Sequence, residues 1–286
     1  MKEGLTLGAS VFFDPELSYR DFCEFVAAHG IRWVEIKLEP VLYYQGVAEE
    51  EAAEFLRRFA ARVPVSVHAL YQELNAGSLN PHVRQVTLEE LKRSVEFAAA
   101  IGPGTVLTVH PGDSAEAPEE LFPAVRENTV EVFRQVLDLA RQRGVQLSLE
   151  NRGQVKRNTY KYGRSFSELT QLRSYLGEDV KYTVDVGHLT FVGQEPEKFV
   201  EQLGAKNVAL AHIHNNRGIE DEHGATPDGL IDYKAFLEAY YSNNWDFPLV
   251  IEVKTMLALL QSLQHLSSLW RQVSRSSRRI RSCTAK

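Results

Sequence analysis

The sequence has little cysteine, no long apolar run and no general excess of basic residues, and each shortage excludes a class of protein. Its 286 residues include two cysteines, Cys23 and Cys283, which are too few for a disulfide framework. A reducing cytoplasm is therefore the expected location. No apolar stretch reaches the roughly 18 residues of a membrane span, and the start Met-Lys-Glu-Gly lacks the apolar core of a signal peptide. We expect no membrane partner.

Positive charge is scarce outside the C-terminal segment. Six of the 32 Lys and Arg residues follow Lys254, where no Asp or Glu occurs, so residues 1–254 hold 26 basic against 38 acidic residues, a net charge of −12. A body of that charge repels a polyanion unless a local basic stripe or bound cations reverse the field. This argues against a nucleic-acid partner. The sequence gives no indication of the oligomeric state.

The chain is rich in short apolar segments that alternate with amphipathic ones. Eight strands are predicted, at Leu5–Ser10, Arg32–Leu38, Val65–Leu70, Thr105–His110, Val145–Glu150, Val180–Asp185, Val208–His214 and Leu249–Val253. Most are rich in Val, Ile and Leu, which suits strands buried on both faces of a parallel sheet. Eight strand–helix units in about 250 residues match a single-domain (β/α)8 TIM barrel. A doubly wound open sheet ranks lower, because no glycine-rich phosphate loop follows the first strand.

Helix start and stop signals fall between these strands. Ser18 precedes a helix that Gly30 closes, and Thr87 to Glu90 reads as a capping box for a helix that ends at Gly102. Further helices are predicted at 119–143, at 166–176, from Pro196, and from Asp232 to Tyr241. Apolar residues from Met256 to Val273 have the spacing of an eighth barrel helix. The barrel is thus expected to cover residues 1–273, and the basic Ser- and Arg-rich tail at 274–286 is expected to be disordered.

Six late strands end on side chains of the types that bind metals. A single His or Glu at a strand end is more often structural, but the set extends over strands three to eight: His68, His110, Glu150, Asp185 with His188, His212 with His214, and Glu252. The strands of a parallel barrel aim these ends at one rim. Crowded carboxylates and imidazoles repel unless a divalent cation lies among them, so the pattern predicts a metal site. Asp221 and His223 lie in a polar loop nearby in sequence, and Glu35, Lys37 and Glu39 alternate on one face of strand two, from which any of them is a candidate for the rim.

These motifs, in this order and spacing, resemble the xylose isomerase-like TIM-barrel superfamily. That superfamily contains sugar phosphate isomerases and epimerases together with the endonuclease IV type of abasic-site nuclease (AP endonuclease family 2). The likeness covers roughly residues 4–256. It depends on His68, Thr-Val-His110-Pro-Gly, Leu-Glu150-Asn151, Asp185-Val-Gly-His188, His212-Ile-His-Asn-Asn, Asp221-Glu-His223, Gly229-Leu-Ile-Asp232 and Ile-Glu252-Val-Lys.

The resemblance to the ketose epimerases implies one divalent ion (Mn, Mg or Co) held by Glu150, Asp185, His212 and Glu252. It also implies that Glu150 and Glu252 act as acid and base, and that His188, His214 and Arg217 contact substrate. The chemistry is coherent in itself. A metal on the carbonyl and hydroxyl oxygens of an α-hydroxy ketone stabilises an enediolate, while paired carboxylates take and return the proton. The expected function is a metal-dependent isomerase or epimerase of a small sugar or sugar phosphate.

The resemblance to endonuclease IV implies the alternative, a zinc-dependent apurinic/apyrimidinic endonuclease with up to three ions. Its ligands would be His68, His110, Glu150, Asp185, His188, His212, Asp221, His223 and Glu252. Such a cluster activates water against a phosphodiester. The acidic body disfavours this alternative, as does the loop after His68, which has an aromatic residue but no positive charge. The only basic stretch near the rim is Lys156 to Arg164. A third interpretation is a barrel that binds a ligand or metal without turnover.

Overall fold

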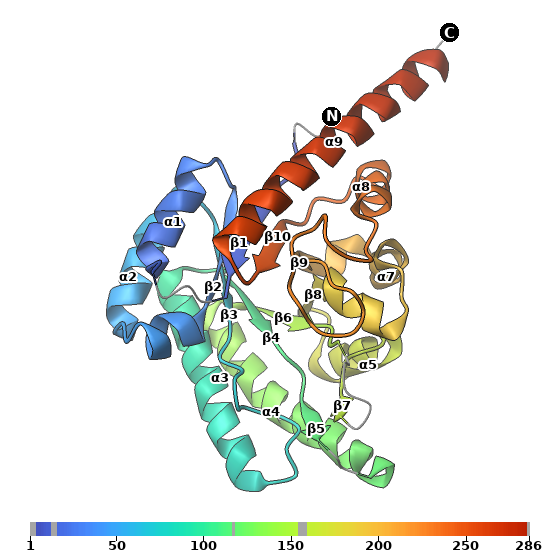
Figure 1. Cartoon of the computed structure of the whole chain (residues 1–286). Coiled ribbons are helices and arrows are strands. Elements are labelled where there is room, and N and C mark those ends of the chain that lie inside the picture. Colours follow the sequence, from blue (N-terminus) through green and yellow to red (C-terminus); the bar gives the residue numbers. More distant parts are fainter. Residues whose placement is uncertain (1–3, 13–15, 116–117, 154–158, 285–286) are drawn as a thin grey trace.

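In the computed structural model, which describes residues 4–12, 16–115, 118–153 and 159–284, eight parallel strands close into a barrel surrounded by helices (Figure 1). Around the barrel the order is β1, β10, β9, β8, β6, β4, β3 and β2. The TIM barrel is therefore confirmed, and the open-sheet alternative is wrong. The strands are β1 Leu7–Val11, β2 Trp33–Lys37, β3 Val65–His68, β4 Val106–Val109, β6 Gln146–Glu150, β8 Lys181–Asp185, β9 Val208–Ile213 and β10 Leu249–Val253.

All eight predicted strands are present, with ends that shift by a few residues. Their burial explains why they could be read from apolar runs. All of β10, β3 and β4 is buried, as a strand covered by helices outside and by packed side chains inside requires. The last residues of β3, β6, β8 and β10 or their neighbours are the polar groups singled out above, so the barrel delivers them to one rim.

The helices are α1 Tyr19–Ala28, α2 Glu49–Phe59, α3 Pro81–Ile101, α4 Phe122–Arg143, α5 Phe166–Leu176, α6 Val186–Leu189, α7 Pro196–Leu203, α8 Tyr233–Ser242 and α9 Met256–Thr284. Single-turn helices lie at Glu119–Leu121, Thr190–Val192 and Ala205–Asn207, and a π-helix at Pro40–Tyr44. The predictions for α1, α4, α5, α7 and α8 are confirmed. Helices α2 and α6 were not predicted, and neither was the small hairpin of β5 Asp113–Ala115 and β7 Thr159–Lys161, which follows the carboxyl ends of β4 and β6. The first three residues of the basic stretch at 156–164 lie outside the described residues.

The predicted start of α3 at Thr87 is wrong, because a better cap lies earlier in the chain. The Asn80 side chain accepts a hydrogen bond from the His82 amide at 3.0 Å, and Pro81 occupies the first helical position. Thr87 lies inside the helix, where its hydroxyl donates to the Val83 carbonyl at 2.8 Å. The predicted end at Gly102 is confirmed.

The segment from Ser274, for which disorder was expected, lies in α9, which continues to Thr284 and projects beyond the barrel (Figure 1). The segment contains no Gly or Pro, its arginines favour helix, and extending an existing helix costs less than nucleating one. Residues 285–286 lie outside the described part. Among the described helices, α9 included, none combines the length and apolarity that crossing a membrane requires.

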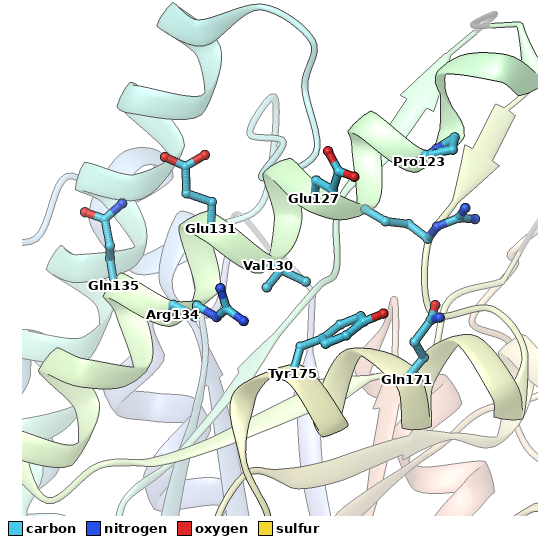
Figure 2. A pocket seen from close by; sticks show the side chains of 9 residues that line it. Pro123, Glu127, Val130, Glu131, Arg134, Gln135, Gln171 and Tyr175 are labelled. Carbon is cyan, nitrogen blue, oxygen red and sulfur yellow. The ribbon is translucent and has the colours of Figure 1, made fainter.

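The largest hollow described, about 640 Å³, lies on the outside of the barrel between α4 and α5 (Figure 2). Helix side chains line it, among them Arg126, Glu131, Arg134 and Tyr175. None of the strand-end residues contributes to its lining. The hollow is therefore separate from the rim chemistry described below.

Candidate active site

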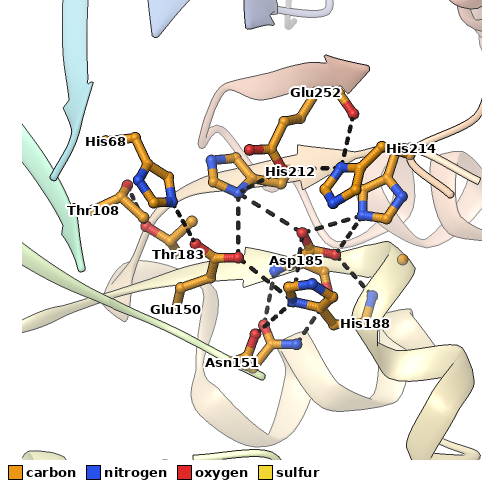
Figure 3. Close-up of polar contacts among 12 residues, drawn as sticks. His68, Thr108, Glu150, Asn151, Thr183, Asp185, His188, His212, His214 and Glu252 are labelled. Atoms are coloured by element: carbon orange, nitrogen blue, oxygen red, sulfur yellow. Dashed lines mark hydrogen bonds and ion pairs between the residues drawn. The ribbon is translucent and has the colours of Figure 1, made fainter. Parts of the chain in front are cut away.

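Four side chains from neighbouring strands meet at the carboxyl end of the barrel (Figure 3). His212 of β9 is at their centre. Its Nδ1 lies 3.3 Å from Glu252 Oε2, 3.7 Å from Glu150 Oε1 and 3.9 Å from Asp185 Oδ2. All four side chains are buried. The quartet that the family resemblance implies is therefore assembled, with its ligand atoms aimed at one small space.

A second group, His68 and His110, approaches the quartet through Glu150. His110 Nε2 lies 3.0 Å from Glu150 Oε2, His68 Nε2 lies 3.3 Å from the same oxygen, and the two Nε2 atoms are 3.3 Å apart. These three residues come from the ends of β3, β4 and β6. Glu150 therefore presents one oxygen to the histidine pair and the other to His212.

A third group joins the rim to the polar loop after β9. Asp221 Oδ2 lies 3.1 Å from His188 Nε2, and Asp221 Oδ1 lies 3.3 Å from His223 Nε2. Ligand atoms of these three residues and of His214 all lie within 4.8 Å of one another. The nine residues of the multinuclear alternative are therefore brought together, in three adjoining groups.

Local structure explains how Asp185 and His188 are held. Asp185 caps the four-residue helix α6, its Oδ1 accepting from the His188 amide at 2.8 Å. The His188 ring is fixed by the Asn151 carbonyl, 2.8 Å from Nδ1. Gly187 allows the close approach of His214, because a Cβ at this glycine would lie 2.0 Å from the His214 ring.

Two residues of strand two belong to the site, although the sequence could name them only as candidates. Glu35 Oε1 lies 2.7 Å from His212 Nε2, and the Lys37 ammonium donates to Glu252 Oε1. Lys37 is buried and lies 4.2 Å from the centre of the Phe12 ring. The third candidate, Glu39, instead accepts from the amide of Gln72 at 3.0 Å and lies outside the group.

The three predicted substrate contacts occupy different places. His188 lines the rim pocket. His214 is fully buried, stacks on His223 with ring centres 3.9 Å apart and lies 3.0 Å from Asp185 Oδ1, so it supports a ligand instead of facing substrate. The Arg217 side chain is 69% exposed and pairs with Glu222 at 3.3 Å, away from the pocket lining. Neither His214 nor Arg217 lines the rim pocket, and their contacts with substrate stay a prediction.

The rim pocket is a cavity of about 240 Å³. It is lined by Phe12, Lys37, His68, Tyr71, His110, Glu150, Arg152, Lys161, His188, Asp221, His223, Glu252 and Lys254. This volume lies below the roughly 300–1,000 Å³ of pockets for drug-sized ligands. A small polar molecule is the kind of ligand that it suits.

Charge determines the protonation of the quartet. Burial would raise the pKa of Glu150, but His110 and His212 hold the pKa well below its usual range. Burial would likewise raise the pKa of Glu252, but His212, Lys37 and His223 hold it low. Burial would lower the pKa of His212, yet Glu252, Glu35 and Glu150 raise it well above the ordinary value. Both glutamates are thus ionised. His212 carries a second proton, and hence a positive charge, when no metal ion is bound.

The donor set fits a divalent ion. Glu252 Oε2 and His212 Nδ1 are buried and have no hydrogen-bond partner among the described residues, although both face the centre of the quartet. Buried polar atoms normally form hydrogen bonds, so two possible ligand atoms that form none and face one point indicate a missing partner such as a metal ion. Carboxylates and imidazole together suit Mn²⁺, Co²⁺ or Zn²⁺. Glu150, Asp185, His212 and Glu252 would hold the ion, with His212 oriented by Glu35.

A closed parallel barrel with buried donors gathered at its carboxyl rim defines a TIM-barrel protein with a candidate metal centre. The profile of the family described as xylose isomerase-like TIM barrel matches residues 23–273, and the chain belongs to this family.

Similar proteins align over nearly the whole chain. The uncharacterized protein MJ1311 of Methanocaldococcus jannaschii is 27% identical over 268 residues, covering 93% of this chain and 88% of its own length. A solved D-tagatose 3-epimerase-like protein superposes with a TM-score of 0.81 at 24% identity, covering 96% of this chain and all of its own. The protein TTHB071 of Thermus thermophilus, soaked with ZnCl2, has a TM-score of 0.69 at 22% identity, covering 93% of this chain and 98% of its own. At these identities the two structures show a shared fold.

Proposed function

We propose that the protein is a divalent-metal-dependent isomerase or epimerase that acts on a small sugar or sugar derivative. One observation carries the proposal: two buried glutamates that line the 240 Å³ pocket, Glu150 and Glu252, both approach Nδ1 of His212. Glu252 comes from β10 and Glu150 from β6, with β9 and β8 between them in the barrel, so the two carboxylates approach the centre from different sides. Similarity to a D-tagatose 3-epimerase-like structure supports the same class.

Each residue of the site would have a distinct role in the proposed reaction. A bound divalent ion would stabilise the negative charge that develops on the substrate oxygens when a carbon-bound proton leaves. One of Glu150 and Glu252 would take that proton and the other would return one. Return to the same carbon on the opposite face inverts that stereocentre, and return to the neighbouring carbon, with a proton passing between the two oxygens, moves the carbonyl. His188, which lines the pocket and is held by Asn151, would orient a substrate hydroxyl.

The test is exchange of a substrate proton. Purified protein loaded with Mn²⁺ or Co²⁺ is incubated in deuterium oxide with a panel of ketoses, ketose phosphates and related hydroxy-carbonyl compounds. We expect deuterium next to the carbonyl of a substrate, and isomeric product. Glu150→Gln and Glu252→Gln should each lower the rate by about 10²–10⁴-fold, the usual contribution of an acid or base. Glu168→Gln, on α5 outside the pocket, is the control. If a compound bound but exchanged no proton for deuterium, the proposal of an enzyme would be refuted and a binding protein would be the remaining interpretation.

A zinc-dependent endonuclease is the second candidate, because the nine residues of its ligand set lie in three adjoining groups. The net charge of −12 over residues 1–254 opposes a polyanionic partner. Metal content distinguishes the two. About one ion per chain after dialysis, with no cleavage of an abasic duplex, agrees with the isomerase. Three zinc ions per chain together with cleavage of the abasic duplex would favour the endonuclease over the isomerase.

A further inference from the structure

Four Lys and Arg side chains line the rim pocket, Lys37, Arg152, Lys161 and Lys254, and the proposed reaction uses none of them. Arg152 follows Glu150 by two residues, and its amide donates to the Gly163 carbonyl at 3.2 Å. Lys161 ends β7 and lies opposite Asp113 in the β5–β7 hairpin. Both side chains line the same cavity as Glu150 and Glu252.

Neither cation is well satisfied by the protein. Arg152 Nε is buried without a hydrogen-bond partner among the described residues, and its one ion pair, to Asp113 Oδ2, is long at 3.6 Å. Lys161 makes no side-chain hydrogen bond or ion pair within the described part of the chain, and its pKa is lowered to about 8, first by burial and then by the charge of Arg152. The same arginine lowers the pKa of His110, after burial. Two adjacent, partly buried positive charges with free donors are costly unless an anion lies between them.

The other charged residues at the rim do not supply the anion that Arg152 and Lys161 require. Lys37 is matched by Glu252, and Lys254 is exposed and reaches the Asp221 carbonyl at 3.3 Å. Asp221 is engaged by His188 and His223. Once a divalent ion balances Glu150 and Asp185, Arg152 and Lys161 are the partly buried positive charges left on the pocket wall, beside the exposed Lys254.

We propose that Arg152 and Lys161 form a subsite for an anionic group on the substrate, a phosphate ester or a carboxylate. Guanidinium and ammonium donors recognise both groups by charge-assisted hydrogen bonds. The inference deepens the proposed function by naming the substrate class: a phosphorylated or carboxylated hydroxy-carbonyl compound whose anionic end lies on this wall while its reacting carbons lie at the quartet.

The test separates anion binding from turnover. Binding of inorganic sulfate to the purified full-length protein is measured by calorimetry in wild type, Lys161→Met and the control Lys234→Met, which removes an exposed lysine on α8. Loss of a hydrogen bond to a charged group should weaken sulfate binding about 10–100-fold in Lys161→Met and leave Lys234→Met unchanged. Arg152→Met should behave as Lys161→Met does, and circular dichroism of each variant checks that it is folded.

Kinetics with matched compounds distinguish a phosphate ester from a carboxylate as the anionic group. The compounds are a neutral ketose, its phosphate ester and the corresponding keto-acid. We expect kcat/KM to favour one anionic member, and that preference to fall about 10–100-fold in Lys161→Met. Sulfate binding that depends on Lys161 without any turnover would support the subsite and count against the isomerase. Turnover that is equal for neutral and anionic compounds, with sulfate binding unaffected by Lys161→Met, would overturn the subsite and leave the isomerase standing.

Discussion

Replacing Lys37 by Met should change stability and metal affinity in opposite directions. The Lys37 ammonium and the Glu252 carboxylate are a buried pair, with side chains 3% and 2% exposed. Removing one member of such a pair costs about 3–5 kcal/mol, because the other charge stays buried without its partner. We therefore expect metal-free Lys37→Met to lose about that much free energy of unfolding, measured by urea denaturation in the presence of a chelator.

Metal binding should become tighter in the same variant. Lys37 orients one oxygen of Glu252, and losing a group that orients a metal ligand costs about 10–100-fold in affinity, or about 1.4–2.7 kcal/mol. Against this, a unit charge and a dication that share one buried carboxylate repel each other by several kcal/mol at an effective dielectric constant of about 20. The repulsion is the larger effect, so removing it should tighten Mn²⁺ binding by about tenfold or more in calorimetric titrations.

Two variants serve as controls for this reasoning. Lys37→Arg keeps the charge and should not tighten metal binding. Glu252→Gln leaves the ammonium unpaired, so it should destabilise the metal-free protein like Lys37→Met but weaken metal binding. If Lys37→Met bound Mn²⁺ more weakly than wild type, orientation would outweigh charge at this site and the argument would be wrong.

Three further changes test other parts of the site. Glu35→Gln removes the negative charge beside His212 Nε2, 2.7 Å away, and should weaken metal binding about 10–100-fold in calorimetry, without loss of fold. Gly187→Ala places a Cβ 2.0 Å from the ring of His214 and should lower the free energy of unfolding in urea by about 1–3 kcal/mol, the cost of overpacking, while stability equal to wild type would show that the ring moves freely. Sulfate, whose charge is constant above neutral pH, should bind less tightly as pH rises through about 8, because Lys161 loses its proton there; a flat profile from pH 7 to 9.5 would contradict the assignment.

Much of this architecture could be predicted because each strand is a local feature. A run such as Leu249–Val253 is wholly buried, so its apolar residues mark the strand and its fourth position marks Glu252 near the rim. Parallel closure then brings the ends together without knowledge of any side-chain contact. Topology accounts for the gathering of the strand-end residues, whereas the choice of Glu150, Asp185, His212 and Glu252 among them came from the resemblance to the ketose epimerases.

Pairing between side chains, and the choice between competing local signals, could not be predicted in this way. Lys37 and Glu252 are separated by 215 residues, and nothing in the strand Trp33–Lys37 identifies the partner of its inward lysine. Arg217 follows His212 closely in sequence, yet the nearby Glu222 holds its side chain at the surface. The start of α3 had two competing caps, at Asn80 and Thr87, and local rules do not rank them. Arg152 follows β6 and Lys161 ends β7, and only the pairing of β7 with β5 puts both on the pocket wall.

The protein itself fixes which atoms remain for a metal. Glu35 engages Nε2 of His212, so the neutral ring carries its proton there and offers Nδ1 to the quartet. Lys37 engages Oε1 of Glu252, so Oε2 is the oxygen that is left. Both ligands are therefore oriented before any ion arrives, from the same strand, β2, which contributes no ligand to the quartet. Without a metal ion the surrounding carboxylates raise the pKa of His212, so Nδ1 is protonated. An ion has to displace that proton, and its apparent affinity must rise with pH for as long as His212 is being deprotonated.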